Sequence, residues 1–484
     1  MISRTDSASI HASSRRRFLK SSLWGACAPA LVTFRYKSLL HVLTEEANRP
    51  PDPWKQASQI LDRVKPPIFP NREFRITSFG AIGDNRSDCT SAFANAILAC
   101  HKAGGGTVVV PKGDFLTGAI RLKSNVRLHL SDGAMVRFTH DLDKYPVVLT
   151  RFEGVELMNF SPLIYALDEE NIAITGTGTI DGNADEQHWW GWKGGSGSEA
   201  ASVTQGSDRK RLFELAERRV PVKERIFGPG HYLRPSLIQP YRCKNVLVEG
   251  VTLLRSPMWQ VHPVLSSNVT VRGLTINSSG PNTDGCDPES CSDVVIDNCF
   301  FNTGDDCIAI KSGRNEDGRR VNVPSQDIVV QNCRMKDGHG GVTIGSEVSG
   351  GIRNIFAQNC HMDSPHLLSA LRIKNNAMRG GDVERVFARN IEVGQVSMAG
   401  LSVDFYYEEG QTGKFTPIVR DVEVQNLTIR EAKYALYMRG FQYAPIEQVT
   451  LSNCNFEGVQ NPNVIEGVKN VSFENVRING KLVS

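Results

Sequence analysis

The sequence predicts an all-β fold, a right-handed parallel β-helix that an α-helix covers at its N-terminal end. A short strand signature, in which Asn or Asp precedes alternating apolar residues, recurs through most of the chain. Several repeats have similar spacing: 23 residues separate Asn245 from Asn268, and 27 separate Asp327 from Asn354. Such strands, with Gly and Asn between them and few helical patterns, indicate the stacked coils of a solenoid. An antiparallel sandwich would not repeat one signature in one register.

The first residue of each signature marks one coil. Asn suits this position because it tolerates a left-handed backbone and can form a ladder of side-chain hydrogen bonds with the next coil. Longer gaps between markers are interpreted as insertions in the turns. The markers are Asn125, Asn171, Asn245, Asn268, Asp293, Asp327, Asn354, Asp421, Gln448 and Asn470.

Residues Asp88 to Ala103 are predicted to form an amphipathic helix over the first coil. Asp88 or Thr90 can cap its N-terminus, and the glycines from Gly104 onward end it. A solenoid needs such a cover because its terminal coil exposes an unpaired strand edge. The predicted buried face consists of Phe93, Ile97, Leu98 and Cys100.

Three segments are predicted along the chain: an export signal and flexible N-terminus over 1–45, a linker over 46–73, and a single β-helix domain over 74–484. The run from Ser14 to Lys20 (SRRRFLK) precedes a weakly apolar stretch and resembles a twin-arginine signal. The protein is therefore expected in the periplasm or outside the cell.

The charge balance narrows the classes of partner. The chain has 55 Lys and Arg against 52 Asp and Glu, a formal net charge of +3. This excludes a polybasic surface over the whole protein, so no nucleic-acid partner is expected. No apolar run reaches the ~18 residues that a membrane helix needs, so no membrane span is predicted. A monomer is expected.

The chain has 11 cysteines, several of which recur at one position of the repeat. This recurrence predicts buried thiols stacked from coil to coil, since free Cys packs as a small apolar residue. A twin-arginine substrate would fold in a reducing compartment, so few disulfides are expected, although Cys286 and Cys291 can pair after export. The cysteines that directly follow Asn are Cys299, Cys333, Cys360 and Cys454.

Four polar segments fall in successive predicted coils. Each alone can be ordinary turn chemistry. The segments are Asn282-Thr283-Asp284, Gly304-Asp305-Asp306, Gly338-His339-Gly340 and Arg372-Ile373-Lys374.

The repeat register brings these segments together. Asp305 lies 12 residues after the marker Asp293, and His339 lies 12 residues after the marker Asp327. Equivalent positions on adjacent coils are about 4.8 Å apart. Asp305 and His339 are therefore predicted to be neighbours.

Strand parity places the basic residues on the same surface. In the strands that follow the polar segments, one set of apolar residues alternates with Lys311, Arg372 and Lys374, which must point outward. Three carboxylates and one His thus converge with these basic side chains on one face. The predicted inward set is Ile308, Ile310, Val342, Ile344, Leu371 and Ile373.

This convergence has a chemical interpretation. Carboxylates this close repel, so one should keep its proton to higher pH and act as an acid while another acts as a base. Cleavage of a glycosidic bond needs this pair of roles. Fixed positive charges beside them suit a substrate that carries carboxylates.

The four motifs, in this order, closely resemble those of the polygalacturonases of glycoside hydrolase family 28, over roughly Phe74 to the C-terminus. The resemblance implies hydrolysis of α-1,4 bonds in polygalacturonate (pectin) by single displacement with inversion. It implies neither a metal nor a cofactor. Asp305 would be the general acid, Asp284 and Asp306 would activate water, and His339 would tune or position the acid.

By the same resemblance, Arg372 and Lys374 would bind the galacturonate carboxylate, and Asn282 would contact substrate or hold the site. A Trp-rich insertion and the stretch from Gly313 to Val323 lengthen turns near the predicted cleft. Additions of this kind in related bacterial enzymes close one end of the cleft, which favours exo action. The insertion contains Trp189, Trp190, Trp192 and Tyr232, which can either stack on sugar rings or pack internally.

Several alternatives stay open. Within the hydrolases, rhamnogalacturonan or xylogalacturonan could be the substrate. A Ca²⁺-dependent pectate lyase would use an Arg or Lys base and carboxylates around the ion, but it would leave His339 and the Asn-Thr-Asp motif without a role. A glycan-binding β-helix without catalysis would not need this set of residues.

Overall fold

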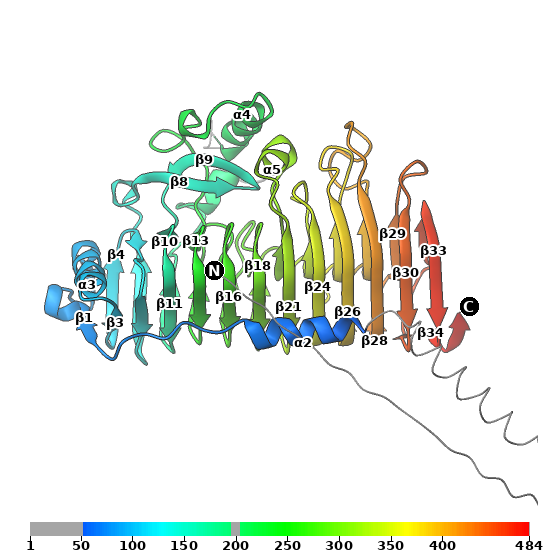
Figure 1. Ribbon diagram of the computed structural model, residues 1–484, viewed down its shortest axis with the longest axis horizontal. Coiled ribbons are helices and arrows are strands. Elements are labelled where there is room, and N and C mark those ends of the chain that lie inside the picture. The colour runs from blue at the N-terminus through cyan, green and yellow to red at the C-terminus, as the bar shows by residue number, and fades with distance from the viewer. Residues whose placement is uncertain (1–51, 195–203, 484) are drawn as a thin grey trace, which may run out of the picture. The chain divides into compact units, whose positions relative to one another are not determined.

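The computed structural model describes residues 52–194 and 204–483. From Pro53 onward the chain forms one compact unit. It is a right-handed parallel β-helix, as predicted, in which strands of successive coils pair in register (Figure 1). The export signal predicted over 1–45 lies outside the described residues. None of the described helices is long and apolar enough to span a membrane.

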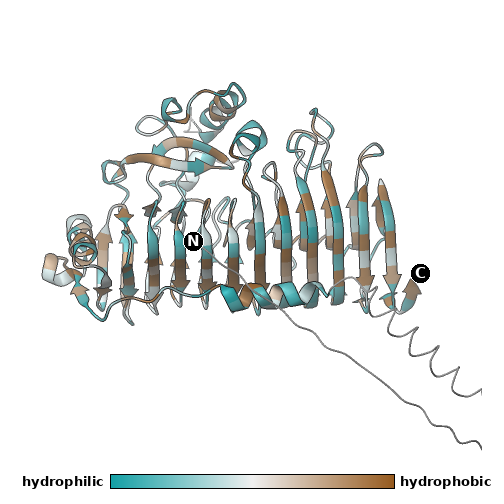
Figure 2. Ribbon diagram, viewed as in Figure 1, coloured by the Kyte–Doolittle hydropathy of each residue, from teal (hydrophilic) through white to brown (hydrophobic). Residues whose placement is uncertain are grey.

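Two rows of strands, which follow each other within each coil, make up the largest sheet. Apolar residues recur at matching places on successive strands (Figure 2) and fill the interior. The strands are β1 (Glu73–Arg75), β2 (Asp84–Asp88), β3 (Gly106–Val110), β4 (Gly113–Thr117), β6 (Val126–Leu130), β7 (Ala134–Phe138), β11 (Glu170–Gly176), β12 (Thr179–Asp181), β14 (Lys244–Glu249), β15 (Thr252–Leu254), β16 (Ser267–Arg272), β17 (Thr275–Ser278), β18 (Ser292–Asp297), β19 (Phe300–Thr303), β21 (Ser325–Gln331), β22 (Arg334–Met335), β24 (Ile352–Met362), β26 (Asp382–Gln395), β28 (Ile418–Glu431), β30 (Ile446–Ser452), β31 (Asn455–Phe456), β33 (Val468–Glu474), β34 (Val476–Ile478) and β35 (Lys481–Val483).

A third row of strands closes each coil and carries the predicted site. Single bridges at Val261 and Cys286 join its two parts into one continuous face. The inward-facing residues predicted for this row are buried, and Ile308 pairs with Val342, which pairs with Leu371. The row contains β5 (Ile120–Arg121), β10 (Ile164–Leu167), β13 (Ile238–Tyr241), β20 (Ile308–Ile310), β23 (Gly340–Ile344), β25 (Ser369–Lys374), β27 (Ala399–Asp404), β29 (Tyr434–Arg439) and β32 (Val464–Glu466).

The coil markers adopt the predicted left-handed backbone, with φ of 58° at Asn245, 52° at Asn268 and 57° at Asp327. Their side chains form the predicted ladder: Asn268 Nδ2 donates to Asn245 Oδ1 at 2.7 Å, and Asn354 Nδ2 donates to Asp327 Oδ1 at 2.9 Å. The ladder continues at Arg385, which has φ 59° and donates from Nε to Asn354 Oδ1 at 2.7 Å. Arg385 was not predicted as a marker because it is neither Asn nor Asp.

The cysteines that follow Asn are buried, as predicted. All ten cysteines in the described residues are free thiols, including Cys286 and Cys291. In the stack, hydrogen bonds with the neighbouring thiols of Cys299 and Cys360, together with burial, raise the pKa of Cys333 well above its ordinary value. These thiols therefore act as core residues.

The predicted N-terminal cover is α3 (Thr90–Lys102), preceded by the short 3-10 helix η1 (Ile76–Phe79). Asp88 Oδ1 accepts the backbone N–H of Thr90 at 2.9 Å. Phe93, Ile97 and Cys100 are buried as predicted, but Leu98 is 42% exposed, so its assignment to the buried face was wrong. Ala92 and Ala96 complete that face instead, because they lie three or four residues from the other buried positions.

An unexpected helix, α2 (Pro53–Arg63), lies within the segment predicted as a linker over 46–73. Trp54 and Ile60 pack against apolar residues on the outer face of the large sheet, and the Trp54 and Phe356 ring centroids are 5.7 Å apart. The spacing of Trp54, Ala57 and Ile60 is that of an amphipathic helix. This part of the segment therefore belongs to the domain.

Long turns on the third-row side of the coils form a separate layer, which we call the cap lobe. In Figure 1 these elements lie together above the coils from β10 to β21. They share a small core around Leu157, Leu212 and Phe227 and a buried ion pair between Arg225 and Asp317 at 2.8 Å. The cap lobe consists of β8 (Val147–Phe152), β9 (Val155–Phe160), η3 (Trp190–Lys193), α4 (Gln205–Glu217), η4 (Val222–Glu224) and α5 (Asn315–Val321); another short helix, η2 (Leu142–Lys144), precedes β8.

Candidate active site

Three carboxylates converge where the chain enters the third row. Asp284 lies in the turn after β17, and Asp305 and Asp306 lie between β19 and β20 of the next coil. One carboxylate oxygen from each of these three residues lies within 4.8 Å of one carboxylate oxygen from each of the other two. The backbone fixes this arrangement, because Gly285 N donates to Asp306 O at 3.0 Å.

His339 lies one coil further and contacts Asp305, as the register predicted. The atoms His339 Nδ1 and Asp305 Oδ1 are 2.8 Å apart. The hydrogen bond to Asp305 raises the pKa of His339 above its ordinary value. Burial raises the pKa of Asp305, but the hydrogen bond and charge of His339 and the charge of Lys374 outweigh it and hold that pKa below the usual range. The two side chains therefore share one proton, held mainly on His339.

Asn282 also contacts Asp305, with Nδ2 donating to Asp305 Oδ2 at 3.3 Å. Its own amide oxygen accepts from Nη2 of the buried Arg234 at 2.8 Å. The same guanidinium donates to Pro281 O at 2.7 Å, which holds the turn before Asp284. Arg234 was not predicted as a site residue, because it lies in the cap-lobe insertion outside the repeat.

Asp306 is held by the basic residues from β25. Lys374 Nζ donates to Asp306 Oδ2 at 2.7 Å, while Arg372 Nη1 lies 3.6 Å from Asp306 Oδ1. Thr343, on the intervening strand, donates to Asp306 Oδ1 at 3.0 Å. Lys374 is thus engaged within the protein, whereas Arg372 has guanidinium nitrogens left to bind a ligand.

Asp284 is the carboxylate whose electrostatics favour the protonated form. Burial and the neighbouring carboxylates Asp287 and Asp305 raise its pKa well above the ordinary value. Lys311 Nζ lies 3.7 Å from Asp284 Oδ2 and offsets part of this repulsion. Asp287 is fully buried, and its pKa is also raised well above the ordinary value by burial and nearby acids. The sequence predicted one carboxylate with a raised pKa, but not that Asp287 would share this property.

Comparison with known proteins identifies the family. The model of glycosyl hydrolases family 28 matches residues 230–478. A crystal structure of a hyperthermoactive exopolygalacturonase from Thermotoga maritima is 47% identical, covers 88% of this chain and 96% of its own, and superposes with a TM-score of 0.86. The chain belongs to glycosyl hydrolases family 28.

Curated relatives agree with this membership. A probable polygalacturonase of Vitis vinifera is 28% identical over 78% of this chain and 73% of its own length. An exo-poly-alpha-D-galacturonosidase of Dickeya chrysanthemi is 26% identical over 83% of this chain and 70% of its own length. As a member of family 28, the protein is a glycoside hydrolase.

Asp284, Asp305 and Asp306 line a pocket of about 200 Å³ whose wall includes parts of the cap lobe. Glu153 comes from the β8–β9 turn, Lys193 from η3 and Arg209 from α4, and Tyr407 comes from the turn between β27 and β28. Lys374 Nζ lies 5.1 Å from the Tyr407 ring centroid. Glu153, Lys193, Arg209 and Tyr407 were not predicted because they lie in insertions without the repeat signature.

The tryptophans of the insertion attach the cap lobe to the coils. Trp189 is buried and packs edge-on against Tyr145 with ring centroids 5.5 Å apart. Trp190 Nε1 donates to Ser256 O at 2.8 Å, and its indole covers Gly280, where a Cβ would collide with the ring. Internal packing therefore accounts for these two tryptophans.

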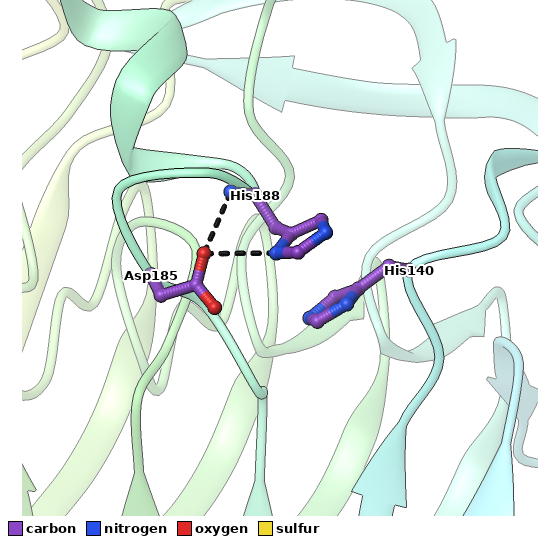
Figure 3. Close-up of side chains that lie close together, drawn as sticks. All are labelled: His140, Asp185 and His188. Atoms are coloured by element: carbon purple, nitrogen blue, oxygen red, sulfur yellow. Dashed lines mark hydrogen bonds and ion pairs between the residues drawn. The ribbon is translucent and has the colours of Figure 1, made fainter.

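A second group with metal-ligand residue types lies further toward the N-terminal coils (Figure 3). His188 Nδ1 lies 2.8 Å from Asp185 Oδ1, and the imidazoles of His140 and His188 stack with centroids 3.5 Å apart and an interplanar angle of 8°. Imidazole lone pairs lie in the ring plane, so two parallel stacked rings cannot both point at one ion. We interpret this group as a hydrogen-bonded stack.

Proposed function

We propose that this protein hydrolyses the α-1,4 glycosidic bonds of polygalacturonate from a chain end. The observation that carries the proposal is the set of three carboxylates, one bound to His339 and one bound to Lys374, in a pocket that Lys193, Arg209 and Lys311 also line. The names of the Thermotoga and Dickeya relatives support the same substrate and an exo mode of action.

In this proposal the pair of Asp305 and His339 supplies the proton to the leaving oxygen. His339 donates to one oxygen of Asp305, and the other oxygen faces Asn282 and the pocket. As the glycosidic bond breaks, the one proton that the pair shares passes through Asp305 to the leaving oxygen, which leaves Asp305 ionised and His339 neutral. The pair thus acts as a general acid although the pKa of Asp305 is lowered.

Asp284 and Asp306 activate water in the same proposal. A raised pKa makes ionised Asp284 a stronger base, and Asp306 is held in place by Lys374 and Thr343. Inverting glycosidases usually separate their two carboxyl groups by about 6.5–9.5 Å, whereas here one oxygen of each carboxylate lies within 4.8 Å of one oxygen of the others. Because Asp306 is held by Lys374 and Thr343, attack by water is favoured over attack by the carboxylate itself.

NMR of the first product should show the inverted (β) anomer, and an α anomer would contradict single displacement.

The basic groups match an acidic sugar. Arg372 keeps donors free beside Asp306, and Lys193 and Arg209 line the cap-lobe side of the pocket. A planar guanidinium binds a carboxylate through two parallel hydrogen bonds. We assign Arg372 to a galacturonate carboxylate, while Lys374 acts mainly through Asp306.

The cap lobe favours exo action. Trp190 packs over Gly280, and Arg234 binds Pro281 and Asn282, so the lobe meets the coil directly on the N-terminal side of the carboxylates. This contact blocks the path of a long polymer past the carboxylates on the N-terminal side of the pocket. Such a pocket accepts a chain end rather than the middle of a chain.

Incubation with polygalacturonate tests this function. Monogalacturonate is expected from the first time points, without a ladder of intermediate oligomers, and the rate should not change in EDTA. Rhamnogalacturonan and xylogalacturonan, incubated in parallel, should yield less product. An unsaturated, ultraviolet-absorbing product that requires Ca²⁺ would indicate a lyase, and retention on pectin without new reducing ends would indicate a binding protein.

The activity should have a bell-shaped pH profile. Asp284 must be ionised to act as a base, and its pKa is raised, so kcat/KM should fall as the pH drops through a value well above ~3.9. His339 must hold its proton, and its pKa is raised, so kcat/KM should also fall as the pH rises through a value above ~6.5. In His339→Asn the alkaline limb should move to lower pH. An unchanged alkaline limb would remove His339 from the proton pathway.

We also propose export by the twin-arginine route, on the basis of the Ser14 to Lys20 run. Replacing Arg15 and Arg16 by lysines keeps the charge but changes the signal. The variant is expected to remain in the cytoplasm as active enzyme, measured by cell fractionation. Equal export of both proteins would contradict this route.

A further inference from the structure

The outer face of the third row continues beyond the catalytic residues. In the strand pairing, Lys374 lies beside Asp404 and then Arg439, and Arg372 lies beside Ser402 and then Tyr437. The columns that carry the two basic residues of the site therefore reach, two strands further on, an arginine and a tyrosine.

Aromatic rings surround Arg439 at the surface. Its guanidinium carbon lies 4.3 Å from the Tyr406 ring centroid, and its Nη1 donates to Tyr437 Oη at 3.2 Å. Tyr443 is 62% exposed and stacks on the buried Phe441 with centroids 5.2 Å apart. Phe441 also supports Tyr406 edge-on, with centroids 5.1 Å apart, so the exposed rings are held by the core.

We propose that Tyr406, Tyr437, Arg439 and Tyr443 form a distal subsite, which binds galacturonate residues of the chain that remains outside the pocket. This inference rests on the proposed function. Aromatic faces suit the apolar faces of sugar rings, and a guanidinium held by tyrosines suits their carboxylates. The cap lobe meets the coil on the N-terminal side of the carboxylates, so the rest of the substrate chain is expected to run toward the C-terminal coils.

The spacing sets the length of chain that reaches the distal subsite. Four strand steps lead from β20, next to the catalytic aspartates, to β29. At about 4.8 Å per step, the distance is about 19 Å, or about four sugar residues. Short oligomers would therefore occupy the pocket alone, whereas oligomers of about five residues or more would contact both places.

Two acidic groups border the distal subsite. Asp404 lies between Lys374 and Arg439 in the column, and Glu466 Oε2 lies 3.6 Å from Arg439 Nε. The Glu466 side chain is 64% exposed, and an exposed pair of this kind contributes little. A galacturonate carboxylate can thus replace Glu466 at Arg439, and removal of Glu466 should favour binding of the chain.

The test compares oligomers of different length. In Tyr443→Ala and Arg439→Gln, kcat/KM should fall about threefold to tenfold for oligomers of about five residues or more, through KM, and stay unchanged for the shortest oligomers cleaved. Glu466→Gln should raise kcat/KM for the long oligomers only. Arg420→Gln serves as the matched control, because Arg420 is an exposed arginine that pairs with Glu384 on another sheet. It should match wild type at every length.

The outcomes separate the two proposals. Wild-type hydrolysis with no effect of the variants, or with equal losses at every length, would overturn the distal subsite and leave the proposed function intact. Absence of hydrolysis of any galacturonate oligomer by the wild type would overturn the proposed function and this inference with it. Thermal unfolding of each variant, expected to match wild type, separates a binding effect from a folding defect.

Discussion

Replacing Asp305 by Asn is expected to lower kcat on polygalacturonate by about 10²–10⁴-fold, because the leaving oxygen then has no proton donor. Asn has nearly the shape of Asp, and its oxygen can still accept the Asp306 N–H, now 3.0 Å from Asp305 Oδ1. The fold should therefore survive, with unchanged circular dichroism and melting temperature. Since the proton is needed in the transition state, kcat and kcat/KM should fall together.

A substrate with a better leaving group tests whether Asp305 acts by protonating the leaving oxygen. A nitrophenyl α-galacturonide needs little protonation on leaving, so Asp305→Asn should retain much more of its activity on this substrate. Asp337→Asn is the matched control. Asp337 is, like Asp305, an aspartate paired with a histidine: Asp337 Oδ1 and His366 Nδ1 are 3.3 Å apart. It does not belong to the group of three carboxylates. It should keep wild-type activity, and near-normal turnover of polygalacturonate by Asp305→Asn would refute the acid assignment.

The part of the site that the sequence predicted is the part fixed by coil register. Because stacked coils repeat one backbone path, equal offsets from the markers put His339 beside Asp305, and strand parity put Lys374 and Arg372 beside Asp306. Left-handed Asn positions could be predicted for the same reason. Arg385 shows the limit, since an arginine can take the marker conformation and continue the ladder without the signature.

The residues that sequence reasoning missed lie where the chain leaves the repeat. Lys193 and Arg209 reach the pocket from the cap lobe, whose fold depends on contacts such as the buried pair of Arg225 and Asp317 between elements distant in sequence. The repeat length of the coils does not predict which cap-lobe residues lie near one another. Helix α2 differs, because the helical spacing of its buried residues Trp54, Ala57 and Ile60 is present in the sequence itself.

Replacing Lys374 by Met should both inactivate and destabilise the enzyme. Lys374 is buried, and its ammonium is 2.7 Å from the buried carboxylate of Asp306. Removing one partner of a buried ion pair costs about 3–5 kcal/mol, because the other charge is left in a poorly solvated place. Asp306 would then move or take up a proton and would no longer orient water. We expect a loss in kcat of at least about 10²-fold.

A double-mutant cycle separates these two effects. In Lys374→Met with Asp306→Asn, residue 306 no longer carries the buried charge that lost its ammonium partner, so most of the free energy of unfolding lost in Lys374→Met should return. Activity should not return, because the carboxylate that orients water is missing. Denaturant unfolding and kcat measured on the four proteins of the cycle test both statements. If the double variant recovered activity along with stability, Asp306 would have only a structural role, and Asp284 alone would have to activate the water.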